Sequence, residues 1–450
     1  MPDHLEALAA FACRRDLDRF DTAAVARARW VILDSLVAMA HGMRVPQMQA
    51  LLRSTLAAAA PGPCWIAGTG RTTNAGDAAL LNGTSGTWLE LNEGCLVAKG
   101  HPGIQVVPIA LALAQQLDAP GEALLRAVLM GYEVSSRVGR GAKLRLAVHP
   151  HGTYGAIGAA VAVAVLEGFD VARMREVIRI ASTLGLATSR RTLLEGATVR
   201  NVYTGHSGSM GLLAARLVQS GFTGESNGVQ TVFGQVLGED FDEGSLSTGL
   251  GAEWIITEGY FKLHPTGRYV HAAIDALHDA LAQAPEGTLV PGAIDRIVVR
   301  TFKLGSMLDG KAITTSFGAR FSIPFALATR LVHGDTSLAA FSDEAVANPQ
   351  VQALAQRIDV QEEPAFTARY PREQATQAVV RLADGRSFTG RCDVMKGESA
   401  NPYRDGEVHD KFMRLGTEAW GEDTAQALRD RFLRLEQFAA MQQVTAGLAP

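Results

Sequence analysis

The sequence predicts a mostly α-helical protein with a smaller α+β domain, and three observations support this prediction. The chain has 450 residues, more than one hydrophobic core usually supports, so two domains are expected. Apolar residues recur at helical spacing up to about residue 264, whereas β-branched, alternating segments occur only within 265–400. Helical patterns then return, so we expect the C-terminal segment to pack against the first domain. The predicted division is 1–264 together with 401–450, and 265–400.

Small and apolar residues at helical spacing predict a series of helices in the first part of the chain. Asp21 and Thr22 can cap a helix over residues 22–43. The segment 74–91 has poor intrinsic helix propensity but carries a small residue at every third or fourth position. We therefore expect packing on most of its surface to stabilise it. Further helices are predicted after Tyr154 and at 46–59, 104–117, 121–139, 171–187 and 206–220.

Strand signals appear only in the predicted second domain. The segment 294–302 is β-branched and partly alternating, and 375–392 is typical of a hairpin around Asp384-Gly385. A mixture of these strands with helices predicts an α+β domain. The helices are expected at 269–284, 319–332 and 345–357, and those of the C-terminal segment at 407–416 and 422–440.

Composition narrows the classes of partner and location. The formal net charge is −4 and no basic block is long enough to follow a phosphate backbone, so nucleic acid is not expected as a partner. The N-terminus lacks a signal-peptide pattern, and the most apolar run, 155–166, is too short to cross a bilayer, so no membrane role is expected. The four cysteines include no C-x-x-C pair, which favours a reducing, cytoplasmic location.

Titratable residues gather in the segment 88–103, between two apolar helices. Glu90, Glu93, Lys99 and His101 lie close together there, and glycines and a proline prevent a continuous helix. Loops held between rigid helices often carry chemistry, so we interpret this segment as the floor of an active site. A solvated, capped connection between two helices would give a similar pattern, and the segment by itself does not decide between the two.

A second polar segment, from His149 through His151 and Thr153 to Tyr154, directly precedes a glycine-rich helix. The free backbone N–H groups and the positive dipole at the start of that helix favour an anionic ligand. The alternative is a simple cap by Thr153, with both histidines bound to backbone groups. The segment around Arg200 is a similar polar helix start, so several such elements are expected to converge on one pocket.

Short motifs that are individually weak occur in one order along the chain. They are Asn82-Gly-Thr84, Gly100-His101-Pro102, Gly131-Tyr132-Glu133, His149 to Gly155, Lys262 to His271, and Ala319 to Pro324. With these motifs, the sequence from about residue 5 to 435 resembles the MmgE/PrpD family. That family includes 2-methylcitrate dehydratase, cis-aconitate decarboxylase and iminodisuccinate epimerase.

The resemblance implies a large all-helical domain formed by both chain ends, with an inserted α+β lid domain. It also implies a homodimer and chemistry on a small anionic polycarboxylate, without a metal or other cofactor, in a cleft between the domains. By the same resemblance, His101 and His149 match histidines of the family, and Lys262 matches a pocket lysine at the domain junction.

The sequence departs from the family pattern at three places. Dehydratase and decarboxylase members carry Asp-Phe-Asp-Asp-Thr where this chain has Glu90-Leu-Asn92-Glu93-Gly94, with one extra residue before His101. Arg200 replaces a lysine of the decarboxylase-like members, and Gly267 replaces a histidine of the decarboxylase. These changes argue against decarboxylation in particular.

The candidate residues suit removal of a proton next to a carboxylate. Histidine needs the least pKa tuning for this step, so His101 or His149 is predicted to be the base and the other the acid or an orienting group. Arg200, Arg268 and Lys262 are candidates to bind carboxylates, and lysine can also donate a proton. The remaining assignments are Tyr154 as an auxiliary proton donor, Asn92 and His151 as substrate-binding residues, and Glu90 and Glu93 as groups that orient a histidine.

Three functions remain open from the sequence. Loss of a leaving group after proton removal would make the protein a 2-methylcitrate dehydratase-like lyase, and reprotonation from the opposite face would make it a dicarboxylate epimerase. The lyase is slightly favoured, and a non-catalytic binding protein on the same fold is the third possibility. No metal is expected because neither H-x-x-x-H nor Cys-His spacing is present, although a divalent ion could in principle be collected by Glu90, Glu93, His101, His149 and His151.

Overall fold

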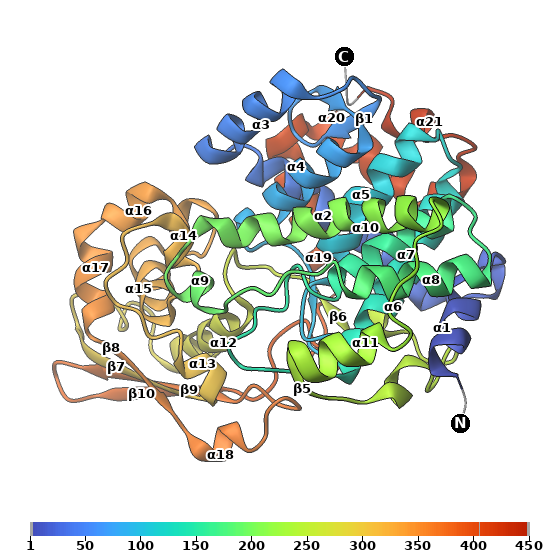
Figure 1. Cartoon of the computed structure of the whole chain (residues 1–450). Coiled ribbons are helices and arrows are strands. Elements are labelled where there is room, and N and C mark those ends of the chain that lie inside the picture. Colours follow the sequence, from blue (N-terminus) through green and yellow to red (C-terminus); the bar gives the residue numbers. More distant parts are fainter. Residues whose placement is uncertain (1–2, 405, 448–450) are drawn as a thin grey trace.

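The computed structural model describes residues 3–404 and 406–447, so residues 1, 2, 405 and 448–450 of the predicted ranges lie outside it. Within the described residues the protein is mostly helical, with one four-stranded sheet and three two-stranded ones (Figure 1). The predicted fold class is therefore confirmed as a mostly α protein with a smaller α+β part.

The first part of the chain forms the predicted series of helices, most of them within a few residues of the expected bounds. They are α1 (His4–Ala12), α2 (Thr22–Gly42), α3 (Pro46–Ala58), α4 (Ala75–Trp88), α5 (Pro102–Gln116), α6 (Gly121–Gly141), α7 (Gly155–Leu166), α8 (Val171–Ser182) and α10 (Val202–Gln219). Shorter elements connect them: η1 (Leu17–Arg19), β1 (Cys64–Ile66), β2 (Arg71–Thr73), β3 (Gly94–Cys95), β4 (Ala142–Leu144), α9 (Arg191–Leu194), η2 (Thr198–Asn201), α11 (Gly228–Gln230), η3 (Thr231–Val236), β5 (Gly238–Phe241), η4 (Glu243–Leu246), η5 (Ile255–Glu258) and β6 (Gly259–Tyr260).

Close contacts between small residues hold the centre of this helical part together. A Cβ on Gly158 of α7 would lie 2.6 Å from the carbonyl oxygen of Gly131 on α6. A Cβ on Gly211 of α10 would lie 2.6 Å from the backbone of Ala159 on α7. Only glycine permits such approaches, so the apolar run of α7 is packed core, as its composition predicts. None of the described helices is both long enough and apolar enough to span a membrane.

The C-terminal segment returns to the helical part. Its elements are α19 (Glu407–Trp420), α20 (Glu422–Phe432), η7 (Leu435–Gln437) and α21 (Met441–Thr445), and α19 packs against α2. The ammonium group of Lys411 on α19 is buried and donates to Asp34 on α2 (2.5 Å) and to the carbonyl oxygen of Leu91 (2.6 Å). The tail therefore supports the polar loop that begins after α4.

The α+β part contains the four-stranded sheet, in the order β10-β9-β7-β8. β7 pairs in parallel with β8, whereas β7 with β9 and β9 with β10 are antiparallel. Gly390 on β10 lets α12 approach, since a Cβ there would lie 2.0 Å from the carbonyl oxygen of Ala276. The elements are α12 (Arg268–Gln283), β7 (Ile294–Thr301), α13 (Lys303–Ser306), α14 (Ser316–Ala319), α15 (Ile323–His333), η6 (Ala339–Phe341), α16 (Asp343–Ala347), α17 (Pro349–Gln356), β8 (Ile358–Glu362), α18 (Pro364–Thr367), β9 (Thr376–Leu382) and β10 (Ser387–Cys392).

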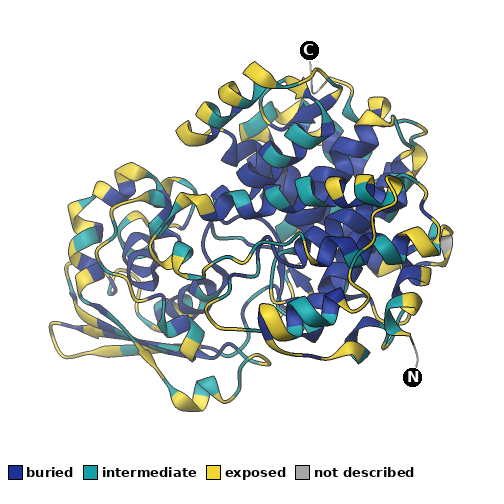
Figure 2. Ribbon diagram, in the orientation of Figure 1, coloured by how far each residue is buried: buried dark blue, intermediate teal, exposed yellow. Residues whose placement is uncertain are grey.

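Two large hydrophobic cores correspond to these two parts (Figure 2). The first contains buried side chains between Leu8 and Phe261 and again between Phe412 and Val444. The second contains buried side chains between Val270 and Leu382. Each part thus has its own interior, and residues at their junction are available to line a site.

Candidate active site

A cavity of about 430 Å³ is lined by residues from both parts of the chain. The helical part contributes its polar wall, from the loop that precedes α5, the loop that precedes α7, and η2. The α+β part contributes the start of α12 and the side chains of Leu304, Met307 and Leu308, together with Phe321 and Tyr370. Segments that lie far apart in the sequence therefore meet at one cavity.

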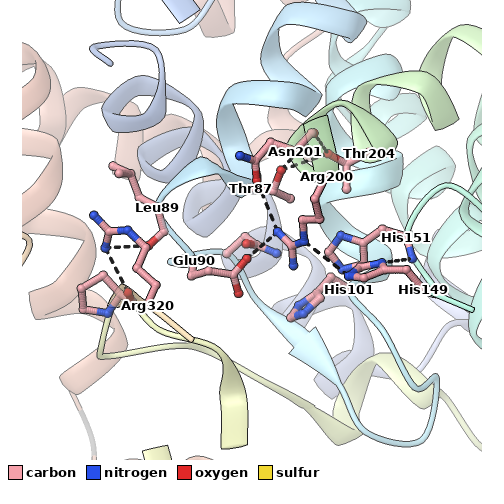
Figure 3. A network of polar contacts seen from close by, with 12 residues as sticks. Thr87, Leu89, Glu90, His101, His149, His151, Arg200, Asn201, Thr204 and Arg320 are labelled. Carbon is pink, nitrogen blue, oxygen red and sulfur yellow. Dashed lines mark hydrogen bonds and ion pairs between the residues drawn. The ribbon is translucent and has the colours of Figure 1, made fainter. Parts of the chain in front are cut away.

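Three imidazoles stand next to one another in the polar wall (Figure 3). The ring centroids of His101 and His151 are 4.8 Å apart, and those of His149 and His151 are 4.7 Å apart, each pair nearly perpendicular. His149 and His151 are buried, whereas His101 remains partly accessible. His151 therefore lies between the two histidines to which the sequence assigns acid–base roles.

His101 presents a free lone pair on Nε2. Its Nδ1 lies 2.6 Å from the carbonyl oxygen of Glu93, and because a carbonyl only accepts, Nδ1 must carry the hydrogen. Burial, followed by the positive charge of Lys262, lowers the pKa of His101 to about 3. The imidazole is therefore neutral at physiological pH, with Nε2 ready to accept a proton.

Both ring nitrogens of His149 face N–H donors. The backbone N–H of His151 donates to its Nδ1 at 3.1 Å, and Nε of Arg200 donates to its Nε2 at 3.4 Å. A neutral imidazole accepts at only one nitrogen, so the two donors compete for one lone pair. Burial, then Arg200, lowers the pKa of His149 well below its usual value. His149 is therefore a neutral imidazole in contact with Arg200.

Glu90 joins two buried cations, Arg200 and Lys262, and Figure 3 shows its contact with Arg200. Its Oε1 lies 2.5 Å from Nη1 of Arg200, and its Oε2 accepts a bond of 2.6 Å from Nζ of Lys262. Burial by itself would raise the pKa of Glu90, but the two cations outweigh it and lower the pKa. The residue has a φ of +52°, a strained conformation found mainly at functional sites. The predicted role of Glu90 is corrected, because its carboxylate is a counter-charge and does not bind a histidine.

Glu93 orients His101 through its backbone carbonyl and not, as predicted, through its carboxyl group. The side chain accepts from the backbone N–H of Gly103 (2.5 Å) and from the hydroxyl of Tyr132 (3.2 Å). Burial, followed by the negative charge of Asp34, raises the pKa of Glu93 to about 8. The carboxyl group is therefore mostly protonated at neutral pH and ties α5 and α6 to the loop.

Arg268 reaches the cavity from the start of α12. Its Nε and Nη2 donate to the carboxylate of Glu398 at 3.1 and 2.7 Å, and its guanidinium lies 4.1 Å from the centre of the Tyr260 ring. Its Nη1 is buried and has no hydrogen-bond partner within the part of the chain that the structure describes. The charge of Arg268 is thus already balanced, while one donor remains for a ligand.

Three other predicted site residues, Lys262, Tyr154 and Asn92, do not line the cavity. The hydroxyl of Tyr154 donates to the carbonyl oxygen of Ala98 at 2.6 Å, and burial raises its pKa. The amide of Asn92 donates to the neighbouring backbone carbonyl, and Lys262 reaches the cavity only through Glu90. Their predicted direct contacts with substrate are corrected to positioning of the wall.

The start of α7 is not open to an anion, contrary to the prediction. The amide oxygen of Gln105 accepts from the backbone N–H of Gly152 and from the hydroxyl of Ser207, both at 3.0 Å. The hydroxyl of Thr153 donates to the carbonyl oxygen of Pro150 and does not cap the helix. A neutral side chain therefore occupies the place that the sequence pattern suggested for a ligand.

One of the groups that a metal would need is already engaged, because the carboxylate of Glu90 is held by two cations. Among residues 3–404 and 406–447, no group of three or more His, Cys, Asp or Glu has an arrangement that could hold a metal ion. That the site works without a metal remains a prediction.

Replacing Tyr154 by phenylalanine should lower stability more than activity. The change leaves the buried carbonyl oxygen of Ala98 without its partner, which costs about 1–3 kcal/mol. Because the hydroxyl does not line the cavity, we expect kcat to stay within a few-fold of the wild-type value. Chemical unfolding and steady-state kinetics measure the two effects. A hundredfold loss of kcat with unchanged stability would restore the proton-donor role.

Several residues of the cavity had no signal in the sequence. The hydroxyl groups of Tyr269 and Tyr370, both in the α+β part, form a hydrogen bond of 2.9 Å. The ring of Phe321 packs against the guanidinium of Arg200. Arg190 lines the cavity while donating to the carbonyl oxygens of Leu146 and Val148. Tyr269 and Phe321 lie inside the motifs Lys262 to His271 and Ala319 to Pro324, which assigned them no role. Arg190 and Tyr370 belong to none of the motifs, and only the tertiary fold brings them to the cavity.

Comparison with known proteins places this site in a family. Sequence profiles described as the MmgE/PrpD N-terminal and C-terminal domains match residues 6–238 and 264–437. The chain is 23% identical over 440 residues to cis-aconitate decarboxylase of Aspergillus terreus, which covers 91% of this chain and 89% of that protein. It is 25% identical over 449 residues to cis-aconitate decarboxylase-like protein oryM of Aspergillus oryzae, covering 93% and 92%. It is 24% identical over 371 residues to cis-aconitate decarboxylase of Mus musculus, covering 78% and 74%. With profiles of both domains matched across most of its length, the chain belongs to the MmgE/PrpD family.

Proposed function

We propose that the protein is a cofactor-independent lyase that removes a proton next to a carboxylate group of a small di- or tricarboxylate. The observation that supports this most strongly is the tautomer of His101, whose Nδ1–H is held by a carbonyl and whose Nε2 is free. The cavity that His101 lines also contains donors for a carboxylate. The relatives named cis-aconitate decarboxylase support a lyase that acts on small carboxylates.

His101 is the proposed base. In the free enzyme its pKa is low, which keeps Nε2 unprotonated but makes it a weak base. A carboxylate bound nearby raises the pKa of an imidazole, because the negative charge favours the protonated form. Substrate binding therefore moves the pKa of His101 toward neutrality, where a general base works best.

Arg200 is the proposed group that stabilises the enediolate-like charge formed after proton removal. Its Nε donates to Nε2 of His149 at 3.4 Å, a long bond that an oxyanion of the substrate can replace. Glu90 fixes Arg200 from the other side with a bond of 2.5 Å. The guanidinium is thus held in place before the charge develops.

Elimination of a hydroxyl group is the favoured second step. The imidazolium of His101, formed when it takes the substrate proton, can pass that proton to the leaving hydroxyl, which gives an unsaturated acid and water and regenerates the neutral base. Gly267 carries no acid at the position where the decarboxylase has a histidine, and a Cβ there would lie 3.0 Å from the Phe321 ring. This geometry favours a dehydratase-like lyase over a decarboxylase.

The α+β part is the proposed lid of the site, and the protein is proposed to act as a homodimer, as the family resemblance implies. Residues of the α+β part form one side of the cavity, so a small rotation of that part changes access to His101. Its separate hydrophobic core lets it move as one body.

The dependence of kcat/KM on pH should reflect the low pKa of His101. The pKa of His101 lies at about 3, below its unfolded value, so the base is unprotonated throughout the range from pH 5.5 to 7.5. We expect kcat/KM to stay nearly constant in this range. A base with the ordinary pKa of about 6.5 would instead lose roughly tenfold between these limits. Steady-state rates at constant ionic strength measure the difference, and such a tenfold loss would contradict the assignment.

Proton NMR in D2O with a panel of di- and tricarboxylates tests the reaction type. The proposed lyase should produce a new vinyl signal from a hydroxy acid, with loss of the adjacent proton. Deuterium entering the position next to the carboxylate with inversion of that carbon, and with no vinyl signal from any acid, would show an epimerase, and loss of carbon dioxide a decarboxylase. No change with any acid of a broad panel would support a non-catalytic binding protein and contradict the proposal.

A further inference from the structure

The cavity also has an apolar side, formed by lining residues other than those around the imidazoles. On the polar side lie the three histidines with Glu90, Arg200 and Arg268. The apolar side combines residues that follow β7 with residues of α9, and neither group makes a polar contact with the histidines. Its members are Leu193, Leu194, Leu304, Met307, Leu308 and Phe321.

This apolar side is incompletely covered by the protein itself. Leu194 is 42% exposed and Leu146, at the rim, is 50% exposed, while Leu304 and Met307 are half-buried. Exposed leucines are common on protein surfaces, but these line a cavity beside a proposed reaction centre. Covering them with an apolar group of a ligand would remove their surface from water.

The cations of the cavity leave few charges for a ligand. Arg200, Arg268 and Lys143 each pair with a glutamate of the chain, at 2.5, 2.7 and 3.0 Å. Of the lysines and arginines that line the cavity, only Lys99 and Arg190 make no ion pair within the described residues, and both donate to backbone carbonyls. The charges of two such cations balance those of one or two carboxylates, whereas a third carboxylate would have no cation to balance it.

The volume of the cavity exceeds that of a compact acid. A dicarboxylate of ten heavy atoms fills less than about 300 Å³, if each atom takes no more than the roughly 30 Å³ that one water occupies. The cavity holds about 430 Å³, so a compact acid would leave part of it unfilled. If the acid lies at the histidines, the unfilled part includes space beside the apolar residues. Water left there would contact leucine and methionine side chains that cannot bind it.

We propose that the substrate is a dicarboxylate that carries an apolar arm of several carbons, with the arm lying against Leu194, Leu304, Met307 and Leu308. This inference rests on the proposed function, because it places the carboxylates of the substrate at the histidine wall. Phe321 continues the apolar side as far as Gly267, where a larger side chain would contact the ring. The arm thus extends from the reacting carbons toward α9 and α13.

A binding series separates this inference from the reaction itself. Succinates with a 2-methyl, 2-propyl or 2-pentyl group have no leaving hydroxyl, so calorimetry measures their Kd without turnover. Each methylene that becomes buried should lower Kd about fourfold. We expect a fall of at least tenfold from 2-methylsuccinate to 2-pentylsuccinate.

Paired variants locate the effect in the cavity. The double change Leu194→Gln and Met307→Gln should abolish most of the dependence on chain length. The control is the double change Leu117→Gln and Leu213→Gln, at leucines that are 49% and 38% exposed and do not line the cavity; it should keep the wild-type dependence.

Either of two results would overturn the inference. One is a Kd that does not fall with chain length, or no binding by any member of the series. The other is an equal dependence in both double variants, which would place the arm elsewhere. If binding strengthens with chain length but the corresponding hydroxy acids give no product, the inference stands and the proposed lyase function fails.

Discussion

Replacing His101 by asparagine should lower kcat by roughly a hundredfold or more, the usual contribution of a general base. The asparagine amide can still donate to the carbonyl oxygen of Glu93, so the loop before α5 keeps the bond that Nδ1 of His101 makes at 2.6 Å. The change removes the imidazole ring with its lone pair on Nε2 but keeps this bond. We therefore expect KM to change much less than kcat, as measured by steady-state kinetics.

The matched control is His206→Asn. His206 is also partly buried and lies near a backbone carbonyl, with its Nε2 3.4 Å from the oxygen of Leu184, but it does not line the cavity. This variant should turn over at close to the wild-type rate. If His101→Asn also kept a near-normal rate, His101 would not be the base.

Replacing Glu90 by glutamine should destabilise the protein by about 3–5 kcal/mol, because it leaves two buried cations without their counter-charge. Arg200 and Lys262 both bind this carboxylate, at 2.5 and 2.6 Å. Adding Lys262→Met to Glu90→Gln removes one of the two uncompensated charges. The double variant should therefore recover part of the loss, which chemical unfolding followed by tryptophan fluorescence can measure.

An exposed ion pair of similar geometry provides the control. Glu195 lies 2.5 Å from Nε of Arg191, but its side chain is 56% exposed, so Glu195→Gln should cost less than about 1 kcal/mol. Equal effects of Glu90→Gln and Glu195→Gln would show that burial does not strengthen the network around Glu90. Such a result would contradict its role as the fixed counter-charge of the site.

Local sequence patterns predicted much of the fold, because the pattern of a helix or a hairpin lies within one short segment of the chain. The helix expected at 22–43 is observed at Thr22–Gly42, and the hairpin expected at 375–392 is observed as β9 and β10 around the Asp-Gly turn. The helix expected at 171–187 ends at Ser182, where the following residues pack against the loop at Thr153. The two-residue strands β3 and β6 are too short to leave a periodic pattern.

A site residue could be predicted only where the sequence around it indicates its chemical role. His101, His149 and Arg200 follow from polar helix starts and motifs, and the structure places all three at one cavity. The partners of a side chain depend instead on tertiary packing. The bond of Lys411 to Asp34 spans 377 positions, and no local pattern in the sequence indicates it. For the same reason, the sequence suggested that Glu90 orients a histidine, although it binds two cations.

Exchange of the hydrogen next to the substrate carboxylate, followed by NMR in D2O, examines the proposed role of His101 without requiring complete turnover. Wild-type protein and His206→Asn should exchange this hydrogen at similar rates, and His101→Asn should slow the exchange roughly a hundredfold or more. Equal exchange in all three proteins would show that Nε2 of His101 does not take the proton.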